Sequence, residues 1–182
     1  MHSEIAIRIA APPDLVFTLA RDVERWSALL PHYARSRAIE RRADGSLVAD
    51  FIARRPLIGL LGLGLPVAWR SRTWSEAGSR RLRFVHVAGA TRGMDVTWRI
   101  EPAPDGETLD PAAVDGDGGA GGAGRTACTV TIEHDFAPRL PGFAAFVDRF
   151  FTRPIAGRTL ATFKALAEAL QSDGAPPTNP DR

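Results

Sequence analysis

Residues 141–171, PGFAAFVDRFFTRPIAGRTLATFKALAEALQ, are the longest stretch of this chain with the period of a helix. Their large apolar side chains recur mostly at intervals of three, four and their sums, as on one face of an α-helix. Those side chains are Phe143, Phe146, Val147, Phe150, Ile155, Phe163, Leu166 and Leu170. The spacing predicts one long amphipathic helix, kinked at Pro154 because proline has no backbone N–H to donate.

Upstream of this helix the chain has the period of β-strands. In EIAIRIAA (4–11) the side chains of Ile5, Ile7 and Ile9 share one face, which is typical of a half-buried strand. Two short helices are expected next, at 14–22 and at 23–33, the second broken at Pro31. Six further strands are expected, at 34–42, 46–54, 67–76, 80–88, 93–102 and 125–136.

The order of these elements shows no alternation of strand and helix. It therefore predicts an α+β protein whose sheet is antiparallel, with the helices packed on one side. We expect a single domain over residues 1–172 and a disordered, proline-rich tail over 173–182. Residues 103–125 are rich in Gly, Asp and Ala, and we interpret them as a disordered insertion in the hairpin between the last two strands.

The composition excludes several classes of function. The chain has 182 residues and a net charge of +2, with acidic and basic residues interspersed, so nothing indicates a nucleic-acid partner. The single cysteine, Cys128, cannot form an internal disulfide, and no Cys/His spacing resembles a zinc site. We expect neither a metal nor a cofactor.

The chain also lacks the sequence features of export or membrane insertion. The N-terminus begins as an alternating strand without the basic and apolar regions of a signal peptide. The most apolar run, residues 56–69, is shorter than the ~20 residues that a membrane helix needs. We expect a cytoplasmic protein.

The later strands each have one charged face and one apolar face. The apolar faces carry a few polar exceptions, and the charged faces are expected to meet water. A curved sheet offers one helix more concave surface than the helix covers, so the surplus is either packed core or a cavity for a small molecule. Both readings remain open at this point. The polar exceptions are Ser71, Thr73, His86 and His134.

Two segments, PPDLVFTLARDVERWSALLPHYARSRAIER (12–41) and RTLATFKALAEAL (158–170), together with the order of elements, resemble a known family. Residues 3–171 are similar to the START/Bet v 1-like (SRPBCC) superfamily, and within it to the polyketide cyclase/dehydrase and lipid-transport group. The resemblance implies the helix-grip fold, a seven-stranded antiparallel sheet wrapped around the long C-terminal helix. It also implies a deep apolar cavity that binds a hydrophobic ligand such as a polyketide, a lipid or a quinone.

The resemblance also implies the positions of site residues. A Trp and a Tyr from the region of the short helices correspond to Trp26 and Tyr33, and a Ser on a central strand corresponds to Ser71. An Arg of some members falls on Thr73, while Arg72 has outward parity and would turn inward only at a strand bulge. The predicted ligand-binding residues are Trp26, Tyr33, Phe51, Leu60, Leu61, Trp69, Ser71, Thr73, Phe84, His86, Trp98 and Phe150.

Three classes of function are compatible with this pattern. The first is a binding or transfer protein for a hydrophobic small molecule. The second is a polyketide aromatase/cyclase that promotes aldol closure and dehydration, with His86 and Tyr33 as the candidate catalytic residues. The third is a protein-interaction module. Each aromatic or histidine on the inner face can equally be packed core, and the pattern makes no prediction about oligomeric state.

The apolar run 56–69, PLIGLLGLGLPVAW, connects the third and fourth strands. Its glycines and proline favour a mobile lid at the mouth of a cavity, with Leu60 and Leu61 over the ligand. A short helix that caps the core is the alternative. If exposed, the segment suits transient contact with a membrane or a carrier protein.

Overall fold

The computed structural model describes residues 1–56, 64–103, 127–138 and 142–173. The chain enters with β1 (His2–Ile9), α1 (Pro13–Arg21), a 3₁₀ turn (Val23–Arg25) and α2 (Trp26–Leu29). Six strands follow: β2 (Tyr33–Arg41), β3 (Leu47–Pro56), β4 (Gly64–Glu76), β5 (Arg81–Gly89), β6 (Asp95–Pro102) and β7 (Cys128–Asp135). The C-terminal helical part comprises α3 (Phe143–Val147), a π-helical turn (Asp148–Thr152) and α4 (Arg153–Asp173).

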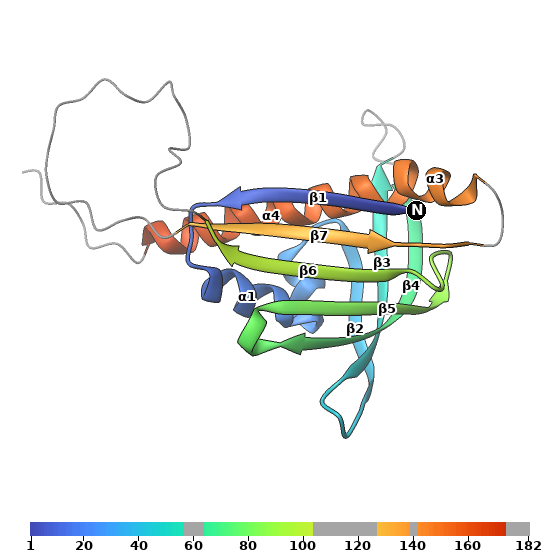
Figure 1. Cartoon of the computed structure of the whole chain (residues 1–182), viewed down its shortest axis with the longest axis horizontal. Coiled ribbons are helices and arrows are strands. Elements are labelled where there is room, and N and C mark those ends of the chain that lie inside the picture. The colour runs from blue at the N-terminus through green and yellow to red at the C-terminus, as the bar shows by residue number, and fades with distance from the viewer. Residues whose placement is uncertain (57–63, 104–126, 139–141, 174–182) are drawn as a thin grey trace, which may run out of the picture.

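The seven strands form one antiparallel sheet in the order β1-β7-β6-β5-β4-β3-β2. The sheet is strongly curved, since β3 and β4 run steeply across the direction of β6 and β7 (Figure 1). The helix α4 lies along β1, and α1 contacts both α4 and β6. The predicted helix-grip architecture is confirmed.

The two faces of the sheet differ as the alternation of side chains predicts. The inner-facing side chains of β5, β6 and β7 are buried. The outer face carries ion pairs between strands, for example Arg70 Nε to Asp50 Oδ1 at 2.6 Å and Arg99 Nη2 to Glu133 Oε1 at 2.7 Å. The charges are therefore on the side of the sheet that faces away from α4.

The second short helix is shorter than predicted. The residues after the 3₁₀ turn form α-helix only as far as Leu29, and Leu30 is already extended with φ −114° and ψ 101°. Pro31 explains this end, because proline disfavours the helical conformation in the residue before it. Tyr33, which the sequence placed at the end of this helix, is instead the first residue of β2.

The predicted irregularity of the long helix takes the form of the π-helical turn, which ends at Thr152, two residues before Pro154. Pro154 has no N–H for the carbonyl of Phe150, so the α-helical ladder is interrupted there. A π turn adds one residue to the helical repeat. Accordingly, Val147, the buried residue just before the turn, and Thr152, the buried residue at its end, are five positions apart.

A polar clamp holds α4 lengthwise against the sheet. Lys164 Nζ donates to the carbonyl of Arg8 at 2.9 Å, and Glu168 Oε1 accepts from the backbone N–H of Ala10 at 2.8 Å. Lys164 and Glu168 also pair with each other at 2.6 Å, one helical turn apart. The end of β1 and the last turns of α4 are thereby held together.

Several sequence predictions lie outside the described residues. They are the insertion at 103–125 apart from its first residue, the tail from 174 onward, and the part of the apolar run that contains Leu60 and Leu61. Among the residues that the structure does describe, none of the helices combines the length and the hydropathy needed to cross a bilayer.

A β-bulge interrupts the pairing of β4 with β5. The register passes from Arg70 opposite Ala88 to Ser71 opposite His86, so Val87 has no partner on β4. Gly89 follows the bulge with φ +94°, and a Cβ on it would lie 2.4 Å from the carbonyl oxygen of Ala68. Only glycine fits this close approach of β5 to β4.

We therefore expect Gly89→Ala to destabilise the fold more than Gly93→Ala. Gly93 also has a positive φ, of +87°, but a Cβ there meets nothing within 4 Å. In the control, Gly93→Ala, backbone strain alone should lower the free energy of unfolding by about 1 kcal/mol. Gly89→Ala should lower it by at least about 2 kcal/mol more. Urea unfolding followed by circular dichroism measures both. Equal losses would show that β4 and β5 do not approach this closely.

Candidate functional site

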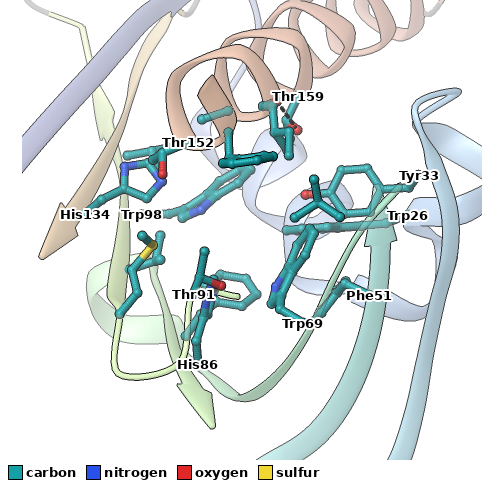
Figure 2. A pocket seen from close by; sticks show the side chains of 18 residues that line it. Trp26, Tyr33, Phe51, Trp69, His86, Thr91, Trp98, His134, Thr152 and Thr159 are labelled. Carbon is teal, nitrogen blue, oxygen red and sulfur yellow. Dashed lines mark hydrogen bonds between the residues drawn. The ribbon is translucent and has the colours of Figure 1, made fainter. Parts of the chain in front are cut away.

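A pocket lies between the concave face of the sheet and the start of α4 (Figure 2). Its volume is about 80 Å³, which is room for a few water molecules. Most of the lining is aromatic or aliphatic: Trp26, Tyr33, Phe51, Val67, Trp69, Phe84, Met94, Val96, Trp98, Ile132, Phe151, Ile155 and Ala156. The polar lining residues are His86, Thr91, His134, Thr152 and Thr159.

Trp26 connects most of the aromatic wall. Five rings surround its indole at centroid distances of 5.4 to 6.0 Å, those of Tyr33, Phe51, Phe84, Trp98 and Phe163. The indole N–H donates to the carbonyl oxygen of Ala20, in the last turn of α1, at 3.0 Å. Because this polar atom is satisfied, the whole side chain is buried without an unpaired donor.

His86 extends from β5 into the pocket. Its ring stacks on Trp69, with 5.8 Å between centroids and 24° between planes. Its Nδ1 lies 2.6 Å from Thr91 Oγ1, which comes from the hairpin between β5 and β6 (Figure 2). Burial and, to a smaller extent, the neighbouring His134 lower the pKa of His86 to about 3. The imidazole is therefore neutral at pH 7.

A second polar position is formed by His134 of β7 and Thr152 of the π turn. His134 Nδ1 and Thr152 Oγ1 are both buried and have no hydrogen-bond partner among the described residues. Burial lowers the pKa of His134 to about 4. Both residues line the pocket at the upper left of Figure 2, away from His86.

A third polar position lies where β2 meets α4. Thr159 Oγ1 donates to the carbonyl of Ile155 at 2.8 Å, and His32 Nε2 lies 2.9 Å from Thr159 Oγ1. Since the threonine proton is already used, His32 is the donor of the second bond. Burial lowers the pKa of His32 to about 4 and raises that of Tyr33 well above its usual value. Both side chains are neutral at pH 7.

The pocket wall is thus uncharged at neutral pH. None of its lining residues within the described part of the chain is Asp, Glu, Lys or Arg, and its two histidines are held neutral by burial. Such a wall can exchange hydrogen bonds with hydroxyl and carbonyl oxygens, but it offers no countercharge.

The structure brings seven of the predicted ligand-binding residues into the pocket lining. Ser71 and Thr73 are buried on the inner face of β4 but do not line the pocket. Ser71 Oγ has no hydrogen-bond partner among the described residues. The seven lining residues are Trp26, Tyr33, Phe51, Trp69, Phe84, His86 and Trp98.

Phe151 occupies the lining position that the sequence predicted for Phe150. The π turn shifts the inward side of the helix by one residue, and the ring of Phe150 lies 4.9 Å from that of Phe146 instead. A regular helical period cannot anticipate this shift.

Arg72 lies outside the pocket. Its Nη2 is 2.6 Å from Asp44 Oδ2, and its guanidinium is 5.5 Å from the ring of Trp74 on the outer face. The bulge that would have turned Arg72 inward is present, but its extra residue, Val87, is on β5 and not on β4. The described pocket therefore lacks the cation that the resemblance implied.

Four polar lining residues are absent from the predicted ligand-binding residues. The alternation of β7 had placed His134 among the polar exceptions on the apolar face, but not in the predicted site. Thr91 is in a hairpin, Thr152 is in the π turn, and Thr159 is one of several small residues on α4. None of these three follows a strand or helix period that could have singled it out.

Comparison with known proteins gives a consistent result. A family model described as polyketide cyclase/dehydrase and lipid transport matches residues 9–163. A putative polyketide cyclase of Streptomyces halstedii is 33% identical over 106 residues, which are 58% of this chain and 92% of that protein. A putative polyketide cyclase of Streptomyces cyaneus is 30% identical over 109 residues, 59% of this chain and 68% of that protein.

Solved structures share the fold. The Zhui aromatase/cyclase of a Streptomyces species matches with a TM-score of 0.69 at 19% identity, over 97% of this chain and 99% of that one. A START superfamily protein of Mycobacterium smegmatis matches with a TM-score of 0.64 at 12% identity, over 93% of this chain and 98% of that one. The family match confirms the predicted resemblance to the polyketide cyclase/dehydrase and lipid-transport group, and the solved structures confirm the fold.

The buried histidines predict a fold that loses stability in mild acid. The pKa values of His86, His134 and His32 in the folded protein lie below the 6.5 of the unfolded chain. The unfolded chain therefore binds more protons below about pH 6.5, and stability falls from there as pH is lowered. Each of these histidines lowers the free energy of unfolding by up to about 1.4 kcal/mol for each pH unit below 6.5.

Urea unfolding at pH 7 and pH 5 measures this loss. His86→Asn removes one titrating group, so the free energy of unfolding should differ less between pH 7 and pH 5 than it does in the unmodified chain. The control is His2→Asn: His2 is exposed, and its pKa is raised by Asp135, so this substitution should not reduce the loss. An unchanged difference in His86→Asn would contradict the burial of a neutral imidazole.

Proposed function

The chain belongs to the polyketide cyclase/dehydrase and lipid-transport family, and on that premise we propose that its pocket binds a neutral, largely planar small molecule of the polyketide type. The observation that carries the proposal is the combination of an aromatic wall with a few neutral polar groups and no charged residue in the described part of the lining. Small-molecule sites typically have this composition, apolar with few placed polar groups.

The arrangement of the polar groups favours a polyketide over other hydrophobic ligands. Polyketides carry oxygen atoms at intervals along a carbon skeleton, and the three polar positions around His86, His134 and Tyr33 are separated by aromatic surface (Figure 2). A phosphate or a carboxylate would be desolvated here without a cation among the described lining residues, which is strongly unfavourable. Lipids with a buried charged head group fit the pocket poorly.

Binding of a multi-ring molecule requires the pocket to widen. The present volume of about 80 Å³ is well below the space that such a ligand fills. Phe151 and Trp69 are the half-buried aromatic lining residues, whereas Trp26, Phe51, Phe84 and Trp98 are nearly fully buried. Trp69 is stacked on both Phe51 and His86. We therefore expect Phe151 to move when the ligand enters, while Trp69 and the rings around Trp26 keep their positions.

Catalysis of an aldol cyclisation is the second candidate function. The relatives named as polyketide cyclases and as an aromatase/cyclase support it, as do His86 and Tyr33 at the pocket wall. Aldol closure needs a group that removes an α-proton and a group that stabilises the enolate. An imidazole with a pKa of about 3 is a weak base for removing the α-proton. Arg72, which could have stabilised the enolate, lies outside the pocket. We therefore propose ligand binding as the first function and catalysis as the second.

Blocking the pocket should abolish binding. Ala156 lines the pocket from α4, whereas Ala161 on the same helix is exposed. With 1,8-dihydroxyanthraquinone as the probe in isothermal titration, Ala156→Leu should weaken binding at least about tenfold, because the added carbon atoms occupy the ligand's space. Ala161→Leu is the matched control and should bind as the unmodified chain does.

Two results would contradict the binding proposal. One is equal affinity of Ala156→Leu and the unmodified chain, with both folded by urea denaturation. The other is a phospholipid recovered in stoichiometric amount when the purified protein is extracted with organic solvent and analysed by mass spectrometry.

The catalytic alternative has its own test. The protein is added to a minimal polyketide synthase, and the products are separated by liquid chromatography with mass detection. If the chain catalyses cyclisation, the product distribution shifts toward ring-closed, dehydrated compounds, and His86→Ala and Tyr33→Phe each reduce the shift at least about tenfold. A shift that survives both substitutions would mean that these residues are not catalytic.

A further inference from the structure

Thr91 is unusual for a residue in a hairpin connection, because its side chain is only 6% exposed. It lies between Gly89 and Gly93, both with positive φ, in the connection from β5 to β6. The hairpin is closed by bonds from Gly93 N to His86 O at 2.8 Å and from Met94 N to Thr91 O at 3.0 Å. This backbone geometry returns the Thr91 hydroxyl to His86, the residue at the base of the same hairpin.

The bond between Thr91 Oγ1 and His86 Nδ1 can be assigned a direction from its protons and its length. A threonine hydroxyl has one proton, and a neutral imidazole has one N–H. Among the described residues, neither Thr91 Oγ1 nor His86 Nε2 has another hydrogen-bond partner. Both residues line the pocket, where either donor can meet water or a ligand, so the assignment depends on the length of the bond between them.

If His86 Nδ1 carried the proton, it would donate to Thr91 as an N–H group, and such bonds are usually about 2.7–3.2 Å long. The separation here is 2.6 Å, which is within the range of about 2.5–3.0 Å that is usual for a hydroxyl donor. If Thr91 donates to Nδ1 instead, its proton is used, and the imidazole proton is on Nε2. His86 lines the pocket, so an N–H at Nε2 can be satisfied there by water or by a ligand.

Trp69 restricts the same imidazole from its face. The two rings are stacked at 5.8 Å, so the plane of the imidazole, and with it the direction of the Nε2–H bond, is set by packing. The donor is thus held by one hydrogen bond at the opposite ring nitrogen and by one ring against its face. A donor prepared in this way binds an acceptor without first losing rotational freedom.

We propose that Thr91 is a positioning residue that holds His86 as the Nε2–H tautomer, so that this imidazole donates a hydrogen bond to a carbonyl oxygen of the ligand. The proposal rests on the proposed function and specifies its ligand: a neutral ketone or quinone oxygen is recognised at His86. A hydrogen bond of this kind strengthens as negative charge develops on the oxygen. His86 would then polarise a carbonyl without transferring a proton, in a pocket whose described lining has no arginine.

The tautomer can be observed directly. In a two-dimensional ¹H–¹⁵N spectrum of protein with ¹⁵N-labelled histidine at pH 7, the two tautomers of His86 differ in the chemical shifts of their ring nitrogens. We expect the Nε2–H form in the unmodified chain and in Thr91→Ser, which keeps the hydroxyl. We expect the Nδ1–H form to become populated in Thr91→Val, which removes it. The Nδ1–H form in the unmodified chain would overturn the proposal.

Binding gives a second, independent readout with a matched pair of probes. Fluorene and 9-fluorenone have the same three rings and differ in a CH₂ and a C=O group. The unmodified chain should prefer 9-fluorenone by about threefold to tenfold, the range expected for one neutral hydrogen bond. In Thr91→Val the ratio of the two affinities should fall toward one. Thr131→Val, at a buried threonine outside the pocket lining, is the control.

The outcomes separate this inference from the proposed function. If the unmodified chain binds both probes equally, or if Thr91→Val keeps the preference, the positioning role is wrong but the pocket still binds planar apolar molecules. If neither probe binds to the unmodified chain, the proposed function itself is wrong. Should Thr91→Val fail to fold, the tautomer in the unmodified chain and the retained preference of Thr91→Ser still decide the question.

Discussion

The packing of Trp26 is the interaction on which the rest of the site depends. Its indole joins three parts of the fold: the short helices through the bond to Ala20, the sheet through Phe51, Phe84 and Trp98, and α4 through Phe163. A large apolar ring that is fully buried contributes several kcal/mol of hydrophobic stabilisation, here about 3–5 kcal/mol relative to alanine. The same ring is part of the pocket wall, so the core and the site share a boundary and are stabilised together.

The charged side chains of the sheet lie on its outer face, whereas the polar side chains in the pocket are neutral. The ion pairs of Arg70, Arg72 and Arg99 lie on the outer face, whereas the pocket holds histidines, threonines and one tyrosine that are all neutral at pH 7. Desolvation lowers the pKa of His86 and of His134 and raises that of Tyr33, so all three side chains stay neutral. It also lowers the pKa of His32, which lies beside the pocket. The consequence is a site suited to oxygen atoms of uncharged molecules.

Most of the fold could be predicted because strands and helices impose different periods on the chain. Alternation placed His86, Trp98 and Ile132 on the inner face, and the helical spacing located α4. The prediction lost accuracy where the period changes. The interval of five between Phe150 and Ile155 coincides with the π turn, which brings Phe151 into the pocket in place of Phe150. Pro31 shortened the second helix and moved Tyr33 into β2, because a residue before proline avoids the helical conformation.

The sequence by itself determined the order of the elements, the two faces of the sheet and the aromatic character of the inner face, since each of these follows from local periodicity and burial preference. Only the tertiary structure decided which of the inner residues meet at the pocket. Thr91 reaches His86 because a hairpin with two positive-φ glycines folds back on its own strand, and Arg72 stays outside because the bulge adds its residue to β5. The physical reason is that periodicity states which face a side chain occupies, whereas its neighbours depend on register, bulges and turns, which are contacts between distant parts of the chain.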